Sequence, residues 1–208
     1  MSRWHTSRAP WSRPEGEAPF APCRRGYHHG NLREALVAAA RLLTAERGPH
    51  GFTMAEAARL AGVSASAPYR HFKDRDALLA ELARRGFDLF ATRLREAATG
   101  RGVREALSAM GRAYLTFARE EPGYYDAMFG WANPAPGPGS GAFGDLRDAV
   151  ARLLPDGTDP DQARLLALEV WAIAHGLASL ARAGQPGADA PPPEAVLEDA
   201  VARLMRVT

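Results

Sequence analysis

A glycine at position 62 separates two helical segments that are each too short to fold alone. Thr53 is a typical helix N-cap, and Glu56 three residues later completes a capping box. The first segment therefore ends just before Gly62, which supplies the turn. Ser64 offers a second cap directly after the turn, and the second segment closes at Phe72. Two short helices joined by a tight turn predict a helix-turn-helix or a plain helical hairpin.

Apolar residues on both sides of this unit recur with helical spacing. Leu32, Leu36, Ala39 and Leu43 fall on one face of a first helix, which Gly48 ends. No stretch alternates convincingly with a period of two. We therefore expect an all-α chain, with further helices at about 74–98, 103–122, 124–131, 143–154, 159–183 and 194–206.

Charge divides the chain near its middle. Residues 1–85 hold 14 Lys and Arg against 8 Asp and Glu, whereas residues 86–208 hold 12 against 16. A basic front half indicates a polyanionic partner such as nucleic acid, or simply a solvated surface.

Two features suggest a cytoplasmic protein. The single cysteine, Cys23, cannot form an intrachain disulfide, which favours a reducing compartment. The longest mainly apolar stretch, Val170–Ala181, is shorter than the roughly 20 residues that a bilayer requires. We therefore expect no membrane partner.

The second short segment has the chemistry of a helix that enters a DNA groove. Its small residues Ala65, Ser66 and Ala67 let the backbone approach base edges in the major groove, about 12 Å wide. Pro68 fits the first turn of a helix, where its missing N–H costs least. Donors that can reach phosphates follow at Tyr69, His71 and Lys73.

The identities of the residues in this region are more informative than the spacing of its helices. The runs Phe52–Ser64 and Pro68–Leu79 closely resemble the DNA-binding domain of TetR-type transcriptional regulators, a resemblance that covers about residues 27–79. The run Tyr27–Arg33 resembles the start of one subgroup of that family. The Trp-His-Gly signature of the same subgroup's C-terminal domain is matched by Trp171, His175 and Gly176.

The resemblance implies DNA contacts residue by residue. Thr53 would donate its hydroxyl to a phosphate. Many relatives have Gly-Thr-Leu or a similar run where this chain has Ser66-Ala67-Pro68. We therefore expect few direct base contacts, with water and DNA shape contributing to recognition. The base-facing residues would be Ser64, Ala65, Ser66, Ala67 and Pro68, and the backbone clamp would be Tyr69, His71 and Lys73.

The expected organisation has three parts. Residues 1–26 contain four prolines and no apolar period, which predicts a disordered arm. Its Arg24 and Arg25 could enter a minor groove or belong to a solvated tail. Residues 27–79 would form a three-helix DNA-binding domain, joined through a linking helix to a helical effector-binding and dimerisation domain at 80–208.

Aromatic residues gather in the rear half. Six of the 17 aromatic residues lie between residues 110 and 131, which suggests either core packing or a ligand pocket. Trp171 and His175 lie one helical turn apart, as a core pair or as ligand contacts. The candidate pocket residues are Met110, Tyr114, Phe117, Tyr125, Met128, Phe129, Trp171 and His175.

The helix expected at 159–183 is apolar nearly all round and must be buried on several faces. With the last helix it could form half of a four-helix homodimer interface. A dimer would place two DNA-reading segments about 34 Å apart, as a palindrome requires. The candidate interface residues are Leu166, Val170, Ile173, Leu177, Leu180, Leu197, Val201 and Leu204.

Other patterns carry less weight. The run Gly139–Gly144 spells a dinucleotide fingerprint but follows a Pro-rich loop instead of a strand. His28 and His29 are adjacent, which is poor geometry for a shared metal. We therefore expect no cofactor, no metal and no catalytic residues.

The sequence thus favours a DNA-binding transcriptional regulator, expected to be a repressor that a small apolar or amphipathic effector releases from a palindromic operator. A non-specific DNA-binding or nucleoid protein is the alternative. An enzyme that uses the rear pocket is a third hypothesis, although no nucleophile–base pair is visible.

Overall fold

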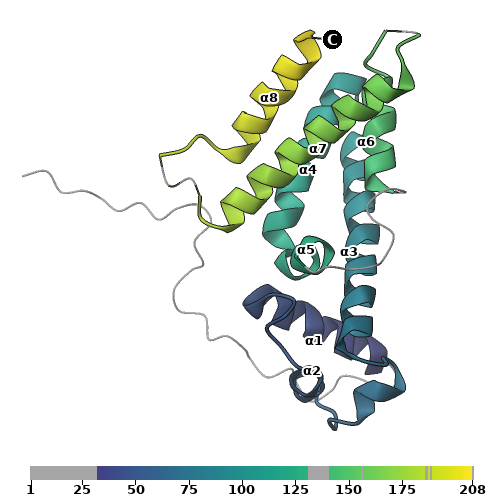
Figure 1. Ribbon diagram of the computed structural model, residues 1–208, viewed down its shortest axis with the longest axis vertical. Helices are drawn as coiled ribbons and strands as arrows, with labels where there is room; N and C mark the ends of the chain where they lie inside the picture. Colours follow the sequence, from purple (N-terminus) through teal and green to yellow (C-terminus); the bar gives the residue numbers. More distant parts are fainter. Residues whose placement is uncertain (1–31, 131–140, 156, 186, 188, 208) are drawn as a thin grey trace, which may run out of the picture.

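The structure is a computed structural model, and it describes residues 32–130, 141–155, 157–185, 187 and 189–207. Within these ranges every regular element is helical, as predicted. Figure 1 shows the long α3 (Arg75–Ala98) joining a lower part, which holds α1 (Leu32–Arg47) and α2 (Met54–Leu60), to an upper bundle. The bundle consists of α4 (Val103–Glu120), α5 (Pro122–Phe129), α6 (Ala142–Ala151), α7 (Pro160–Arg182) and α8 (Pro193–Val207).

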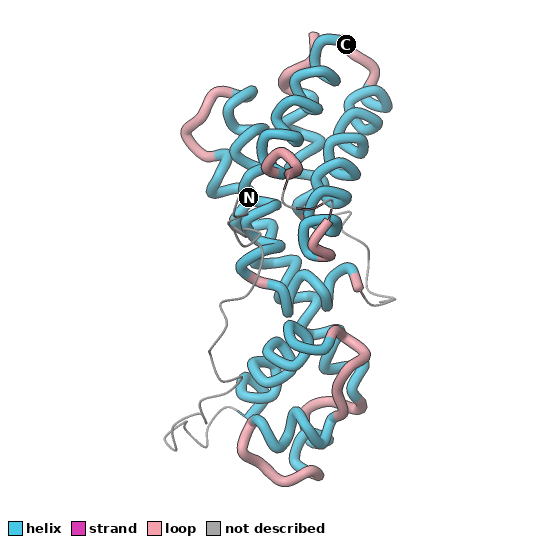
Figure 2. The backbone as a smooth tube through the Cα atoms, turned by 90° about the vertical axis from the view of Figure 1, so that its left-hand side faces the viewer, coloured by secondary structure: helices cyan, strands magenta, loops and turns pink. Residues whose placement is uncertain are grey.

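Two hydrophobic cores correspond to these two parts, and Figure 2 shows the parts from the side. The lower core is built around Leu36, Phe52 and Leu82, and the upper core around Phe90 and Phe117. Helix α3 contributes to both cores because it is long enough for its apolar face to run through both parts. The predicted domain boundary at residue 79 therefore falls inside a continuous helix.

The N-cap predicted at Thr53 is confirmed, whereas the one predicted at Ser64 is wrong, because the regular turn begins after Ser66 without a side-chain cap bond. Thr53 Oγ1 accepts from the Glu56 N–H at 3.2 Å, and the Thr53 N–H donates to Glu56 Oε2 at 2.8 Å, so the capping box is complete. Asp74 Oδ1 accepts from the Ala77 N–H at 2.8 Å and begins α3. These bonds satisfy N–H groups that a helix start leaves unpaired.

Gly62 makes the turn after α2 possible. Its φ is +74°, in the left-handed region that a side chain disfavours. The Val63 N–H reaches back to the Ala58 carbonyl at 3.0 Å, and the Gly62 N–H reaches the Arg59 carbonyl at 3.1 Å. This pair of bonds is a Schellman motif, which caps the helix and reverses the chain.

The prediction of a second short helix from Ser64 is wrong in kind. The regular part of this segment is a single 3-10 turn, η1 (Ala67–Arg70). Because Pro68 has no N–H, it cannot donate to the Ser64 carbonyl, which instead accepts from the Ala67 N–H at 3.0 Å. The reading segment is therefore shorter than expected.

The predictions for the arm 1–26, for Arg24 and Arg25, and for the start of the first helix lie outside the described residues. The dinucleotide-like run also begins outside them.

Replacing Gly62 by alanine should lower the free energy of unfolding by about 1 kcal/mol, because a Cβ strains the positive φ. Gly144 lies inside α6 with open space around an added Cβ, so Gly144→Ala should instead stabilise the protein by up to about 1 kcal/mol. Urea unfolding of both variants measures whether each substitution lowers or raises the free energy of unfolding. A Gly62→Ala protein as stable as the wild type would contradict the role of this turn.

Candidate nucleic-acid interface and interior cluster

The segment from α2 through η1 carries an exposed polar surface. Most of the predicted DNA-contacting residues lie on it with exposed side chains: Thr53, Ser64, Ala65, Ser66, Tyr69, His71 and Lys73. The Tyr69 side chain is 59% exposed, which is unusual for a large aromatic residue. Ala67 is half-buried.

The prediction for Pro68 is wrong. Its side chain is fully buried, so it supports the turn from beneath and does not face a groove. Phe72 is also buried in the lower core, with the Arg33 guanidinium 5.3 Å from its ring centre. These two side chains fix η1 on the core and leave its other face free for contact.

Three cations on this surface have no ion-pair partner among the described residues: Arg59, Arg70 and Lys73. Arg59 and Arg70 were not among the DNA contacts predicted from the sequence. By contrast, Arg84 and Arg85 of α3 both pair with Glu81. Unpaired, solvated cations beside small residues are suited to phosphate contacts.

Thr53 already uses its hydroxyl proton. Thr53 Oγ1 donates to Glu56 Oε2 at 2.9 Å, and Arg47 holds the same carboxylate at 2.8 Å. The hydrogen bond from the Thr53 backbone N–H, together with those from the Thr53 hydroxyl and Arg47, holds the pKa of the Glu56 carboxyl below its ordinary value. A phosphate at Thr53 would have to compete with this carboxylate for the hydroxyl.

The eight residues predicted for a pocket come together in the upper bundle, in contact with the core. Tyr114 lies edge-on to Trp171 with ring centres 5.4 Å apart, and Phe90 from α3 lies edge-on to both. Phe129 and His175 are half-buried and the other six predicted residues are buried. The cluster joins α4, α5 and α7.

A polar group lies inside this aromatic cluster. His175 Nδ1 is 2.9 Å from the Tyr114 hydroxyl and 3.1 Å from the Tyr125 hydroxyl. Burial raises the pKa of both tyrosines and lowers the pKa of His175, because it disfavours the charged form of each group. The group therefore contains two neutral phenols and a neutral imidazole at pH 7.

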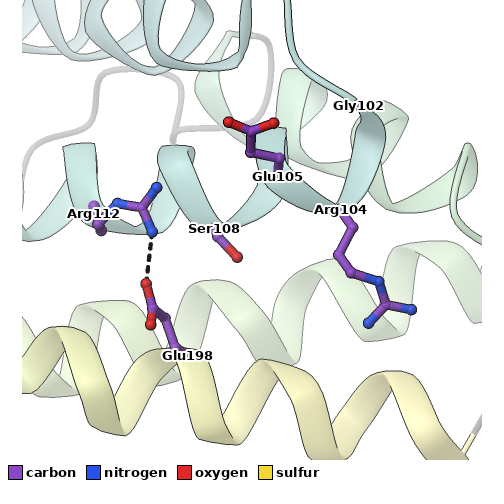
Figure 3. A pocket seen from close by; sticks show the side chains of 6 residues that line it. All are labelled: Gly102, Arg104, Glu105, Ser108, Arg112 and Glu198. Carbon is purple, nitrogen blue, oxygen red and sulfur yellow. Dashed lines mark hydrogen bonds and ion pairs between the residues drawn. The ribbon is translucent and has the colours of Figure 1, made fainter.

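A surface hollow of about 600 Å³ lies elsewhere, between α4 and α8. Figure 3 shows the Arg112–Glu198 ion pair, 2.6 Å long, joining the two helices across it. The other lining residues are Gly102, Arg104, Glu105 and Ser108. The predicted pocket residues do not line this hollow.

Helix α5 connects the aromatic cluster to the lower core. Tyr125 and Met128 belong to the upper core, while Ala127 is fully buried in the lower one. A Cβ added at Gly123 would lie 2.1 Å from the Arg41 carbonyl oxygen of α1, so the two backbones touch. A Cβ added at Gly86 of α3 would lie 2.8 Å from Met128 Sδ.

Ion pairs reinforce the position of α5. Glu121, which directly precedes it, accepts from Arg41 of α1 at 3.0 Å and from Arg93 of α3 at 2.9 Å. Asp126 of α5 accepts from Arg182 of α7 at 2.6 Å. Helices α1, α3 and α7 therefore hold this short element through ion pairs.

The interface prediction is wrong for Leu166, Val170 and Leu197, which lie in the core of a single chain. Ile173, Leu177, Val201 and Leu204 pack against the same core while half-buried. Leu180 is exposed in the single chain, as a residue of a dimer interface would be before a second copy covers it. The most exposed leucines of α7 are Leu165 and Leu168, which the prediction left out.

Helix α7 is longer than the apolar stretch expected from the sequence. By length and composition it could cross a membrane, with a mean hydropathy of 1.3 over an 18-residue window. One of its faces packs in the upper core, which is typical of a core helix in a folded domain. Among the described residues, no group of three or more His, Cys, Asp or Glu could hold a metal ion.

The chain matches two family descriptions. Residues 36–82 match the bacterial regulatory proteins of the tetR family, and residues 107–204 match the tetracyclin repressor-like C-terminal domain. The second match is consistent with the Trp-His-Gly subgroup.

Two curated relatives have similar sequences. YobS of Bacillus subtilis, an uncharacterized HTH-type transcriptional regulator, is 31% identical over 98 residues, which are 47% of this chain and 51% of YobS. Rv0681 of Mycobacterium tuberculosis, described in the same words, is 28% identical over 174 residues, or 83% of this chain and 79% of Rv0681. The chain thus aligns with about half the length of YobS.

Solved structures share the fold. A protein of unknown function from Rhodococcus sp. RHA1 superposes with a TM-score of 0.71 at 31% identity, covering 88% of this chain and 98% of that one. A transcriptional regulator from Rhodococcus sp. Rha1 gives a TM-score of 0.60 at 26% identity, covering 84% and 96%.

Acid should destabilise the fold through His175. Because the folded state lowers the pKa of this imidazole, the unfolded chain binds more protons, so stability falls as the pH drops below the ordinary value of 6.5. His175→Gln should flatten the pH dependence of unfolding between pH 7 and 5.5. His50→Gln, at an exposed position, is the control and should follow the wild type. Parallel pH profiles for all three proteins would contradict the buried, neutral imidazole.

Proposed function

Because this chain belongs to the TetR family of DNA-binding transcriptional regulators, we propose that it is a homodimeric repressor released from a palindromic operator by a small molecule. The observation that carries the DNA part of the proposal is the exposed face of the α2–η1 unit, where Arg59 and Arg70 have no ion-pair partner among the described residues while Pro68 is buried beneath them.

DNA binding would use this face in two ways. Arg59, Arg70 and Lys73 would neutralise phosphates, which sets affinity and register without reading sequence. The residues directly before the 3-10 turn offer small side chains at Ala65 and Ser66, which allow close approach but few hydrogen bonds. Recognition would therefore depend strongly on DNA shape and on bridging water.

Dimerisation would use the outer face of α7 and its neighbour α8. Leu165 and Leu168 are 58% and 53% exposed, and an added Cβ at Gly176 would meet no atom within 4 Å. With the exposed Leu180 and Val196, these positions form an apolar face that one chain leaves uncovered. A second copy would cover it and would also account for the high hydropathy of α7.

Release from DNA would pass through α5. A ligand in the aromatic cluster would contact Tyr125 and Phe129, and α5 touches α1 through Gly123 and α3 through Met128. A shift of α5 would therefore move both helices that carry the DNA-binding unit. Switching a two-state equilibrium from 1:99 to 99:1 requires about 5.5 kcal/mol of differential ligand affinity. With DNA as the partner, we place the protein in the cytoplasm.

Selection of genomic fragments by the purified protein, followed by footprinting against excess random DNA, tests this function. A repressor of this kind should protect one discrete site with two symmetric halves about one helical turn apart. Uniform protection that random DNA abolishes would instead indicate a non-specific DNA-binding protein.

Lys73→Ala should weaken binding to specific and random DNA alike, because the lost contact is to phosphate. The slope of log K against log salt should become shallower by about one unit. Arg147→Ala, on the exposed surface of α6, provides the control and should change neither quantity. Unchanged affinity and slope for Lys73→Ala would show that this residue does not contact phosphate.

A further inference from the structure

The Tyr125 ring lies in an aromatic site formed mainly by side chains of α4 and α7. It lies nearly parallel to the His175 ring, with centres 5.9 Å apart and an interplanar angle of 23°. Tyr114 approaches it edge-on at 6.4 Å, and the Arg182 guanidinium lies 5.5 Å from its centre. Phe129, on the same helix, closes the remaining side at 4.9 Å. The site therefore fits one flat aromatic ring.

The polar end of this site specifies a hydroxyl group. The Tyr125 hydroxyl lies 3.1 Å from His175 Nδ1, and the Tyr114 hydroxyl lies 2.9 Å from the same nitrogen. A hydroxyl can donate to Nδ1 when this nitrogen carries a lone pair and accept from it when it carries the proton. A carbonyl has no proton to donate, and an ammonium has no lone pair to accept with. A hydroxyl is therefore the group that pairs with either tautomer of the neutral imidazole.

The site lies close to the protein surface. His175 and Phe129 are half-buried, and the Arg182 side chain is 25% exposed. Tyr125 itself is only 4% exposed, so another molecule would reach its position by displacing its ring. Because Tyr125 belongs to α5, the displacement would move the helix that contacts α1 and α3.

We propose that Tyr125 is a built-in stand-in for the effector, and that the effector is a hydroxylated aromatic molecule whose ring and hydroxyl replace those of Tyr125 against His175 and Tyr114. This names the ligand class for the interior cluster, and its regulatory consequence rests on the proposed function. The displaced Tyr125 gives up contacts that the effector then makes.

The experiment compares p-cresol, which has the structure of a tyrosine side chain, with toluene, which lacks only the hydroxyl. Isothermal titration measures their binding to the intact protein and to Tyr125→Phe, which keeps the ring but loses the competing hydroxyl. The wild type should bind p-cresol weakly, and Tyr125→Phe should bind it about tenfold more tightly. Tenfold corresponds to about 1.4 kcal/mol, the scale of one buried hydrogen bond.

Three comparisons control this result. In Tyr125→Phe, toluene should bind about tenfold more weakly than p-cresol, because it forms no hydrogen bond with the His175–Tyr114 pair. Adding Tyr114→Phe to Tyr125→Phe should weaken p-cresol binding, since it removes a hydroxyl that pairs with the ligand where no Tyr125 hydroxyl competes. Tyr124→Phe, one residue from Tyr125 and outside the hydrogen-bonded group, should bind p-cresol like the wild type.

The proposal is overturned if Tyr125→Phe does not bind p-cresol more tightly than the wild type, or if toluene and p-cresol bind equally. It is also overturned if no saturable binding to Tyr125→Phe occurs up to the solubility of p-cresol. A fluorescence-anisotropy assay with the selected DNA separates the two proposals. Binding as described with unchanged DNA affinity would retain the phenol site and refute release by this ligand.

Discussion

The contact between Gly123 and the backbone of α1 is the constraint on which the working of this structure depends. With no side chain at position 123, α5 lies directly against the Arg41 carbonyl, and it cannot move without α1 moving or a gap opening. Closely packed interiors resist such gaps. The same short helix places Ala127 in the lower core and Tyr125 in the upper one. One rigid element of two turns therefore belongs to both parts of the protein.

This arrangement explains why the interior cluster suits a regulatory site. The neutral Tyr114–Tyr125–His175 group is held among aromatic edges, so its geometry is well defined and its polar atoms are satisfied. At the far end of α3, Pro68 and Phe72 anchor a short turn whose outer face is polar and cationic. The interior cluster and the DNA-contacting surface are thus separate, and helices α3 and α5 connect them.

Most of the helices were predictable from the sequence because local rules govern them. Apolar spacing located most of the described helices, the capping box located α2, and Thr53 caps it as expected. The members of the aromatic cluster were also predictable, since six of the 17 aromatic residues lie between residues 110 and 131. What failed depends on three-dimensional context. Helix α7 has apolar residues all round, so periodicity could not tell that Leu166 faces its own core while Leu165 faces outward. Likewise, nothing local distinguishes a buried Pro68 from an exposed one.

The link between the two parts can be measured directly through Gly123. A methyl group there would lie 2.1 Å from the Arg41 oxygen, so Gly123→Ala must push α5 away from α1. Overpacking of this kind costs about 1–3 kcal/mol. The account predicts that Gly123→Ala, still folded by circular dichroism, binds the selected DNA at least about tenfold more weakly. Gly144→Ala, where an added methyl group meets open space, should bind that DNA like the wild type. Wild-type DNA affinity in a folded Gly123→Ala protein would contradict the account.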